Sequence, residues 1–265
     1  MTSQSTAPSA DTLLSTIRSD ADALAMSEPL LAGLVRHLTP NGARLVDIVC
    51  RRLASVLEEA DVPQERLLGL LREVAATAPQ IEESLASDLI ALRSRDPACL
   101  SFLHAVINFK GFQALQTYRI ANELWRAGRP GLAAWLSNRA SLVLGPDIHP
   151  AARLGKGIML DHGSGIVIGE TAIIEDDVSI LQGVTLGGTG KDTGERHPVI
   201  RCGVMIGAGA KILGRVVIGA QSKVAAGSVV LKDVPPRCTV AGVPAQIVRL
   251  HSGDDMPAAT MQQSI

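Results

Sequence analysis

Aromatic residues are scarce in this chain of 265 residues, in which Phe, Trp and Tyr together make up only 2%. Hydrophobic residues still account for 46% of the sequence, so the core must be built from Leu, Ile, Val and Ala. From residue 143 onwards there is no aromatic residue. The second half therefore predicts a narrow interior into which only aliphatic side chains fit.

Long apolar runs and basic runs are also lacking. No apolar stretch approaches the ~20 residues that a membrane-spanning helix needs, and the opening MTSQSTAPSA has no apolar segment of a secretory signal. The net charge is −1, so nothing favours nucleic acid or an anionic membrane as a partner. We expect neither.

The four cysteines, Cys50, Cys99, Cys202 and Cys238, lie far apart and form no CxxC pair. This spacing argues against a zinc site and against a disulfide framework. It favours reduced thiols, and hence a cytoplasmic protein without a metal.

Residues 11–142 predict a helical domain, preceded by a disordered segment over 1–10. Apolar residues recur at helical spacing from Leu45 to Leu57 and from Ile81 to Leu92. Asp96 followed by Pro97 predicts the start of another helix, with Asp96 as its N-cap. A further amphipathic stretch runs from about Gly111 to Trp125.

The second half has a period of six. An aliphatic residue recurs at every sixth position, apart from a two-residue slip and one longer insertion. The series consists of Ile148, Leu154 and Leu160, then Ile168, Ile174, Ile180 and Leu186, and then Ile200, Ile206, Ile212, Ile218, Val224 and Val230. An ordinary sheet rich in Val and Ile would not keep this phase for so long.

A hexapeptide repeat predicts a left-handed parallel β-helix, in which each hexapeptide forms one short strand and one corner of a triangular coil. The expected fold class is therefore α + β, with an N-terminal all-α helical domain followed by this β-helix over 143–250. The polar segment 251–265 is expected to be a flexible tail.

Function is expected where the repeat breaks. The first break, LDHGSGIV, contains Asp161 and His162. The second, LGGTGKDTGERHPVI, contains Arg196 and His197, and its length predicts a loop over 187–199 that projects from the coil. These breaks gather ionisable side chains that a regular solenoid does not require.

His162 has the pKa range of a general base, about 6.5 when unperturbed. A base of this kind needs one ring nitrogen free and the other held by an acceptor. Asp147 lies 15 residues upstream, close to the ~18 residues of a coil, so both residues could fall on one side of adjacent coils. The alternative is that both residues only cap turns.

Several segments resemble the signatures of serine O-acetyltransferases. They are DIHPAARLGKGIMLDHGSGIVIGETA, VTLGGTGKDTGERHPVI and GVMIGAGAKILG, with RSRDPA and KGFQALQTYRIANELW in the helical half. The resemblance runs from about residue 11 to about residue 250. It implies transfer of acetyl from acetyl-CoA to the hydroxyl of L-serine, giving O-acetyl-L-serine for cysteine synthesis, with acetyl-CoA as co-substrate and L-cysteine as inhibitor.

The resemblance also implies roles at matching positions. His162 resembles the base, Asp147 its orienting carboxylate, Asp161 and Asp96 the acceptors for the serine ammonium, and Arg196 with His197 the clamp on its carboxylate. An anionic and a cationic end suit a zwitterion, and Arg offers a planar fork to a carboxylate. Asp96 acting only as a helix cap, and Arg196 only as a solvated loop charge, are the alternatives.

A groove for acetyl-CoA between neighbouring solenoids is likewise implied, lined by Gly188, Thr189, Ala208, Lys223 and Ala226. Small residues there let the pantetheine arm approach backbone groups, and Lys223 either meets a phosphate or is simply solvated.

The family assembles as trimers that pair into hexamers, so we expect the same here. A tail ending in Ile resembles those that enter the active site of O-acetylserine sulfhydrylase, and Ile265 is the expected contact.

Three other interpretations compete. A γ-carbonic anhydrase type of zinc site needs two histidines about one hexapeptide apart, and the chain has no such pair. An acetyltransferase for a sugar or antibiotic would show no preference for an amino acid. A pure scaffold protein would not explain Asp, His and Arg at the repeat breaks.

Overall fold

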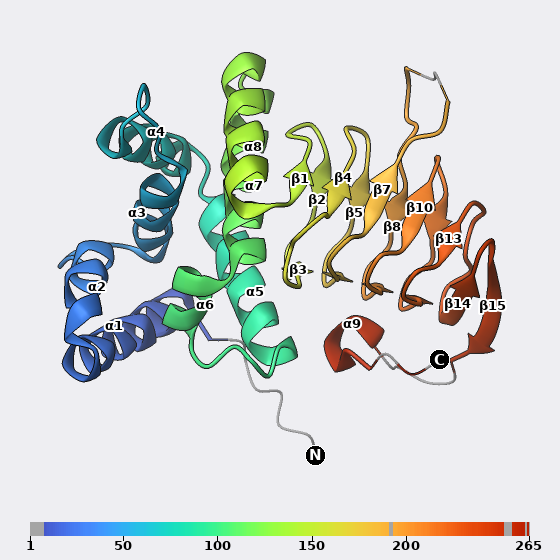
Figure 1. The fold of residues 1–265 in the computed structure, drawn as a ribbon, viewed down its shortest axis with the longest axis horizontal. Coiled ribbons are helices and arrows are strands. Elements are labelled where there is room, and N and C mark those ends of the chain that lie inside the picture. Colours follow the sequence, from blue (N-terminus) through green and yellow to red (C-terminus); the bar gives the residue numbers. More distant parts are fainter. Residues whose placement is uncertain (1–7, 191–192, 252–255, 263, 265) are drawn as a thin grey trace.

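The computed structural model describes residues 8–190, 193–251, 256–262 and 264, and shows a helical part beside a coiled β-structure (Figure 1). The helices are α1 (Ala10–Ser27), η1 (Pro29–Leu31), α2 (Ala32–Leu38), α3 (Leu45–Leu57), α4 (Gln64–Thr77), α5 (Gln80–Arg95), α6 (Phe102–Asn108), α7 (Lys110–Arg126), α8 (Pro130–Leu144) and α9 (Pro257–Thr260). No described helix is both long and apolar enough to cross a membrane.

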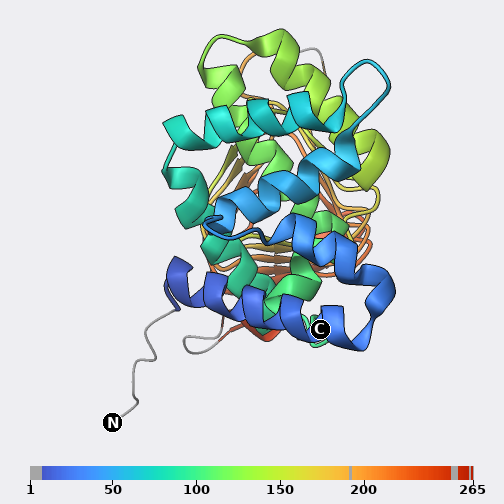
Figure 2. The same ribbon diagram turned by 90° about the vertical axis from the view of Figure 1, so that its left-hand side faces the viewer.

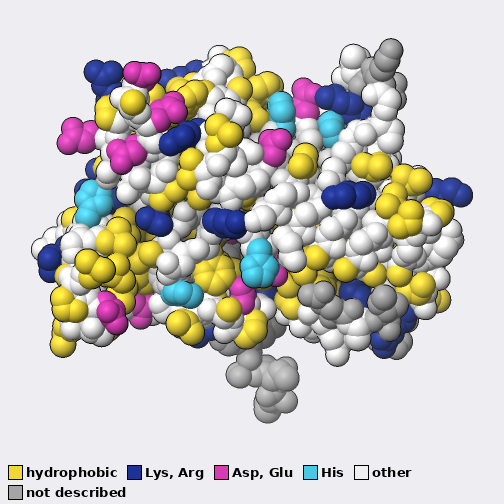
Figure 3. Space-filling view, in the orientation of Figure 1, with side chains coloured by type: hydrophobic (Ala, Val, Ile, Leu, Met, Phe, Trp, Pro, Cys, Tyr) yellow, Lys and Arg dark blue, Asp and Glu magenta, His cyan; other side chains and the backbone are white. Residues whose placement is uncertain are grey.

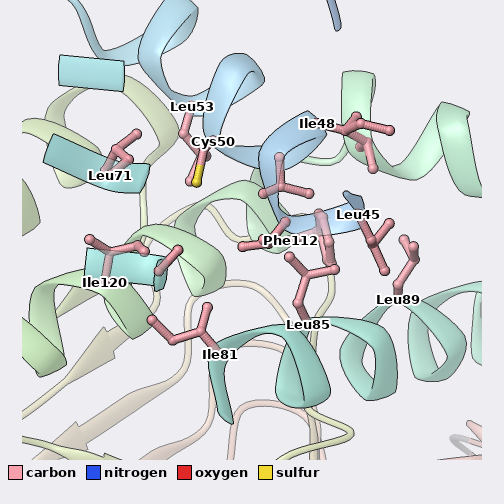
Figure 4. Close-up of a cluster of buried hydrophobic side chains, with 14 of the residues drawn as sticks. Leu45, Ile48, Cys50, Leu53, Leu71, Ile81, Leu85, Leu89, Phe112 and Ile120 are labelled. Carbon is pink, nitrogen blue, oxygen red and sulfur yellow. The ribbon is translucent and has the colours of Figure 1, made fainter. Parts of the chain in front are cut away.

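The helical core forms where apolar stripes of α3, α4, α5 and α7 face one another (Figure 4). Leu45, Leu53, Leu85 and Leu89 are each at most 1% exposed, and burying such side chains stabilises the fold by about 1.5–3 kcal/mol each. The two helices predicted from spacing over 45–57 and 81–92 are confirmed as α3 and α5.

The predicted helix start at Asp96 is wrong. Asp96 is the C-cap of α5, and its carboxylate accepts a hydrogen bond from the backbone N–H of Ala98 at 2.8 Å. The next helix, α6, begins six residues later at Phe102 with Ser101 as its N-cap. Asp96 therefore lies in a connecting turn, where its side chain is only partly buried.

Helix α7 joins the two parts of the protein. Its Phe112 belongs to the helical core, whereas its Leu115 and Tyr118 belong to the core of the coil. Gly111, at its start, lies so close to the carbonyl oxygen of Leu160 that any Cβ there would overlap it. Figure 2 shows the helices covering one end of the coil, whose strands run behind them.

The coil is built from short strands in three sheets. They are β1 (Asp147–Ile148), β2 (Arg153–Leu154), β3 (Met159–Leu160), β4 (Val167–Ile168), β5 (Ile173–Ile174), β6 (Ser179–Ile180), β7 (Thr185–Gly187), β8 (Val199–Ile200), β9 (Met205–Ile206), β10 (Lys211–Leu213), β11 (Val217–Ile218), β12 (Lys223–Val224), β13 (Val229–Val230), β14 (Cys238–Gly242) and β15 (Ala245–Leu250). From β1 to β13, successive strands of the chain fall into different sheets, and each strand pairs in parallel with the strand three places on. The first, second and third sheets begin with β1, β2 and β3.

The register explains the period of six. Ile148, Ile168, Leu186, Ile212 and Val230 are aligned partners along the sheet β1-β4-β7-β10-β13, so one inward residue per strand stacks into a column. All five are at most 4% exposed. The predicted left-handed parallel β-helix is thus confirmed, together with the helical domain before it.

The far end of the coil closes differently. Strand β14 pairs in parallel with β12, and β15 then turns back antiparallel along β14. In the tail that follows, the described part contains the short helix α9, whose Ala258 is fully buried. The Ser179 hydroxyl of β6 donates a hydrogen bond to the Ala258 carbonyl at 2.8 Å, so this segment lies against the third sheet.

Candidate active site

The residues of the two repeat breaks lie at two different corners of the triangular coil. The turns that lead from the third sheet back to β4, β7, β10 and β13 form what we call the base corner, residues 161–166, 181–184, 207–210 and 225–228. The turns that follow β1, β4 and β7 form the clamp corner, residues 149–152, 169–172, 188–190 and 193–198. The sheet that begins with β1 lies between the two corners.

His162 is held at the base corner in an unusual backbone conformation. Its φ is +55°, a left-handed value that few non-glycine residues adopt and that often marks a functional turn. The neighbouring Gly163 lies close to Gly111 of α7 and to Pro146, which leave little room for a side chain at this position. The His162 side chain is 73% exposed, with Nε2 3.8 Å from the nearer Asp161 carboxylate oxygen.

Two carboxylates lie beside this histidine. Burial raises the pKa of Asp161, His162 opposes this shift, and the nearby charge of Asp96 adds to it. Two carboxylates held close together favour a bound cation, because its positive charge offsets their mutual repulsion. The structure therefore brings together Asp96, Asp161 and His162, which lie on two elements far apart in the sequence.

Asp147 lies at the start of β1, exposed, on the side of the base corner. Its backbone N–H donates to the carbonyl of Ile166, which places β1 beside the 161–166 turn. In the described chain no hydrogen bond joins its carboxylate to His162. The role of Asp147 as the residue that orients His162 therefore stays a prediction.

The clamp corner holds Arg196 through an acid that sequence reasoning missed. An Nη nitrogen of Arg196 donates to the Glu170 carboxylate at 2.7 Å, and this hydrogen bond lowers the pKa of Glu170. Glu170 lies in the turn after β4, one coil before the insertion. The Arg196 side chain is 26% exposed, so it remains partly accessible to a ligand.

His197 is only 7% exposed and packs against the same turn. The Thr171 hydroxyl accepts hydrogen bonds from the backbone N–H groups of Arg196 and His197, at 3.0 and 3.1 Å. Thr171 was also missed. The sequence does contain a signal for Glu170 and Thr171. They form a polar pair at the corner one coil before the insertion, where a regular repeat does not require polar residues.

Four of the five residues predicted to meet acetyl-CoA lie in the two corners. Gly188 and Thr189 are exposed in the clamp corner, and Ala226 is exposed and Ala208 half-buried in the base corner. Lys223 lies apart from them on the outer face of β12. Its ammonium donates to the carbonyl of Gln262 at 3.1 Å and to that of Ser264, so in this structure it holds the tail.

Within one chain the two corners do not meet. The charges that act on Asp161 are those of His162 and Asp96, whereas those that act on His197 are Arg196, Glu170, His149 and Arg215. No hydrogen bond or ion pair between described residues connects the two sets. Figure 3 shows histidine side chains at several places on this face. In the described ranges, no group of His, Cys, Asp and Glu is arranged to hold a metal ion.

Comparison with known proteins identifies the relatives of this chain. The family profile described as "Serine acetyltransferase, N-terminal" matches residues 13–117, and the bacterial transferase hexapeptide profile matches residues 197–232. A serine acetyltransferase of Salmonella typhimurium is 50% identical over 247 residues, which cover 93% of this chain and 90% of that protein. The chain belongs to the serine acetyltransferase family.

Solved serine acetyltransferases have the same fold. The structure from Vibrio cholerae has a TM-score of 0.94 at 48% identity, and covers 97% of this chain and 99% of its own. A serine acetyltransferase in complex with cysteine has a TM-score of 0.93 at 45% identity, with 96% and 98% covered. One from Brucella abortus contains coenzyme A, with a TM-score of 0.88 at 46% identity and 91% and 96% covered.

Proposed function

We propose that this protein transfers acetyl from acetyl-CoA to the hydroxyl of L-serine, giving O-acetyl-L-serine and CoA as the first step of cysteine biosynthesis. The observation that carries the proposal is the chemistry of the two corners. One presents carboxylates beside a histidine, and the other presents a guanidinium. Serine, a zwitterion with a hydroxyl to be deprotonated, fits such a pair, and the family membership supports the same substrate.

The proposed mechanism is a direct transfer. His162 takes the proton from the serine hydroxyl as its oxygen attacks the thioester carbonyl. The C–S bond of the thioester then breaks, and the proton passes from His162 to the leaving sulfur, so that CoA departs as the thiol and the base is restored. Asp161 and Asp96 bind the serine ammonium, while Arg196 and His197 bind its carboxylate. Asp147 orients His162 once the substrate is bound. Charge complementarity at both ends of the substrate fixes its hydroxyl beside the base.

Acetyl-CoA is proposed to lie along the exposed small residues of both corners. Small residues leave backbone groups accessible to the pantetheine arm. They are Gly188 and Thr189 in the clamp corner, and Ala208 and Ala226 in the base corner. In this proposal Lys223 meets a CoA phosphate only after it releases the tail carbonyls that it binds in this structure.

The proposal is tested by offering acetyl-CoA with each common amino acid in turn and measuring the thiol released. L-Serine should be acetylated in clear preference to the others, and L-cysteine, which has the same ammonium and carboxylate, should inhibit. Equal rates with sugars or with all amino acids would contradict it.

The four thiols, all free in this structure, fit the reducing cytoplasm that we propose as its location.

We further propose that three copies form a trimer, and that trimers pair through the helical domains into a hexamer. The separation of the two corners supports the trimer, because a site then forms where the base corner of one copy faces the clamp corner of the next. Exposed apolar side chains of α8 and β4, Leu142, Val143 and Val167, provide surface for such a contact.

A shared site predicts recovery of activity when two inactive variants are mixed. His162→Ala damages the base corner and Arg196→Ala the clamp corner, so each variant alone should have little activity. In trimers that contain both variants, about one site in three should be intact, because threefold symmetry places each base corner against one neighbour's clamp corner. The variants are co-expressed with different affinity tags, and doubly tagged protein is assayed.

Two His162 variants, His162→Ala and His162→Asn, co-expressed in the same way serve as the control, since no arrangement of them rebuilds a site. Doubly tagged trimers of His162→Ala and Arg196→Ala that stay as inactive as this control would place both corners of a working site in one chain. An active monomer by light scattering would contradict the trimer as well.

The tail is proposed to bind an O-acetylserine sulfhydrylase through Ile265, a residue that lies outside the described residues. The free carboxylate can take the place of the amino-acid carboxylate in that enzyme, and the Ile side chain adds apolar burial. Deleting Ile265 alone should abolish binding in calorimetry and leave acetyl transfer unchanged. Equal affinity of intact and truncated proteins, or no binding by the intact one, would contradict this assignment.

A further inference from the structure

The second histidine of the site has one ring nitrogen whose protonation the structure defines. Nδ1 of His197 lies 3.2 Å from the backbone nitrogen of Thr171 and 2.9 Å from the Thr171 hydroxyl oxygen. A backbone N–H can only donate. Nδ1 must therefore be the acceptor, which means that it carries no proton.

The hydroxyl of Thr171 leads to the same conclusion by a separate count. A hydroxyl has two acceptor lone pairs and one hydrogen. Both lone pairs are used, by the backbone N–H groups of Arg196 and His197. Only the hydrogen is left for the contact with Nδ1, so the hydroxyl donates there. A protonated Nδ1 would point at the backbone N–H of Thr171 and at its hydroxyl oxygen, which has no free lone pair. Such an Nδ1–H would have no acceptor.

The surroundings of the ring disfavour its positive charge as well. Burial lowers the pKa of His197, and Arg196, His149 and Arg215 lower it further, while Glu170 alone among the charged groups that face it acts in the opposite direction. The ring is therefore neutral near pH 7. With Nδ1 unprotonated, its single proton is on Nε2.

The Nε2 edge of the His197 ring lies against two glycines, which leave room for it. A Cβ on Gly169 would collide with Nε2 and Cδ2 of the ring, and a Cβ on Gly188 would lie 3.4 Å from Nε2. Gly169 has no positive φ, so it is the ring rather than the backbone that excludes a side chain at this position. Among the described residues no partner takes a hydrogen bond from Nε2, which leaves this N–H for a ligand.

We propose that Thr171 and Gly169 are positioning residues that hold His197 as the neutral Nε2–H tautomer, so that it donates a hydrogen bond to the substrate carboxylate and cannot act as a base. The first half stands on the geometry alone, and the second rests on the proposed function. The two histidines of the site thereby have opposite roles. The lone pair of His197 is buried against Thr171, whereas His162 is exposed and free to accept a proton.

The tautomer is tested by solid-state ¹⁵N spectroscopy of the assembled protein with labelled histidine. The His197 signals are identified as those lost in His197→Gln. They should show an unprotonated Nδ1 and a protonated Nε2 at about pH 7 and above, because the pKa of His197 lies below the ordinary histidine value of about 6.5. A protonated Nδ1, or an imidazolium near neutral pH, would overturn the proposal.

Thr171→Val and Thr171→Ser separate this role from a purely structural one. Valine has the shape of threonine without its hydroxyl, so the His197 ring should titrate at higher pH than in the wild type. The KM for serine should rise about two- to tenfold, as expected for one weakened hydrogen bond, with a smaller change in kcat. Serine keeps the hydroxyl and should restore both the spectrum and the KM.

Failure of this inference differs from failure of the proposed function. If the wild-type protein does not acetylate serine, the spectrum still decides the tautomer. If it does acetylate serine but Thr171→Val leaves both the His197 signals and the KM for serine unchanged, Thr171 does not position the ring.

Discussion

Replacing His162 by Ala is expected to lower kcat for acetyl transfer by about 10²–10⁴-fold, the usual contribution of a general base. The fold should persist, because the side chain is 73% exposed and its removal leaves no buried cavity. His162→Asn is the better variant where folding is in doubt, since Asn tolerates the left-handed φ of +55° at this position. Initial rates of thiol release at saturating serine measure the effect.

His37→Ala is the matched control, because His37 is also exposed but lies in α2, outside both corners. It should keep wild-type turnover. Asp147→Asn should reduce kcat in the same direction as His162→Ala, but less. Near-normal turnover of both His162 variants at neutral pH, with the assembly intact by light scattering, would remove His162 from the mechanism.

The β-helix was predictable because its rule is local and repeated. Each coil places one aliphatic residue per strand in the interior, as the column from Ile148 to Val230 shows, and an error in one hexapeptide does not shift the next. The turn at Asp96 has no such redundancy. An Asp before Pro suits the start of a helix, but here the same carboxylate closes a turn after α5.

The contacts of the clamp corner were not predictable in this way, because Glu170 and Arg196 are 26 residues apart, one coil plus the length of an insertion. The division of the site residues between two corners could have been predicted from the sequence. The first break follows β3, the third strand of its coil, and the second follows β7, the first strand of another. Counting strands between the breaks assigns His162 and His197 to different corners of the triangle.

The second large effect is expected far from both corners, at the junction of the helices with the first coil. Asp88 of α5 is fully buried. Its carboxylate accepts hydrogen bonds from Arg119 Nε and Nη2 of α7 at 2.7 and 2.9 Å, and from the backbone N–H of Ile158 at 3.0 Å. Arg119 also donates to the carbonyl of Gly155. One ion pair therefore ties two helices to the coil.

Asp88→Ala should lower the free energy of unfolding by about 3–5 kcal/mol, because it leaves the Arg119 charge buried without a partner. Adding Arg119→Met to Asp88→Ala should recover a large part of the loss, since the uncompensated charge is then gone. Urea unfolding followed by circular dichroism, at one fixed protomer concentration, measures both changes.

Glu83→Ala provides the comparison at the same junction. Glu83 is also on α5 and pairs with Lys156 of the first coil at 2.5 Å, but both side chains are largely exposed. Water solvates the lysine that remains, so the unfolding midpoint should hardly move. Equal shifts of the unfolding midpoint for Asp88→Ala and Glu83→Ala would show that the buried Asp88–Arg119 pair contributes no more to stability than the exposed Glu83–Lys156 pair. A much larger shift for Asp88→Ala, reversed in the double variant, would establish that the buried Asp88–Arg119 pair contributes strongly to the stability of the junction between the helices and the coil.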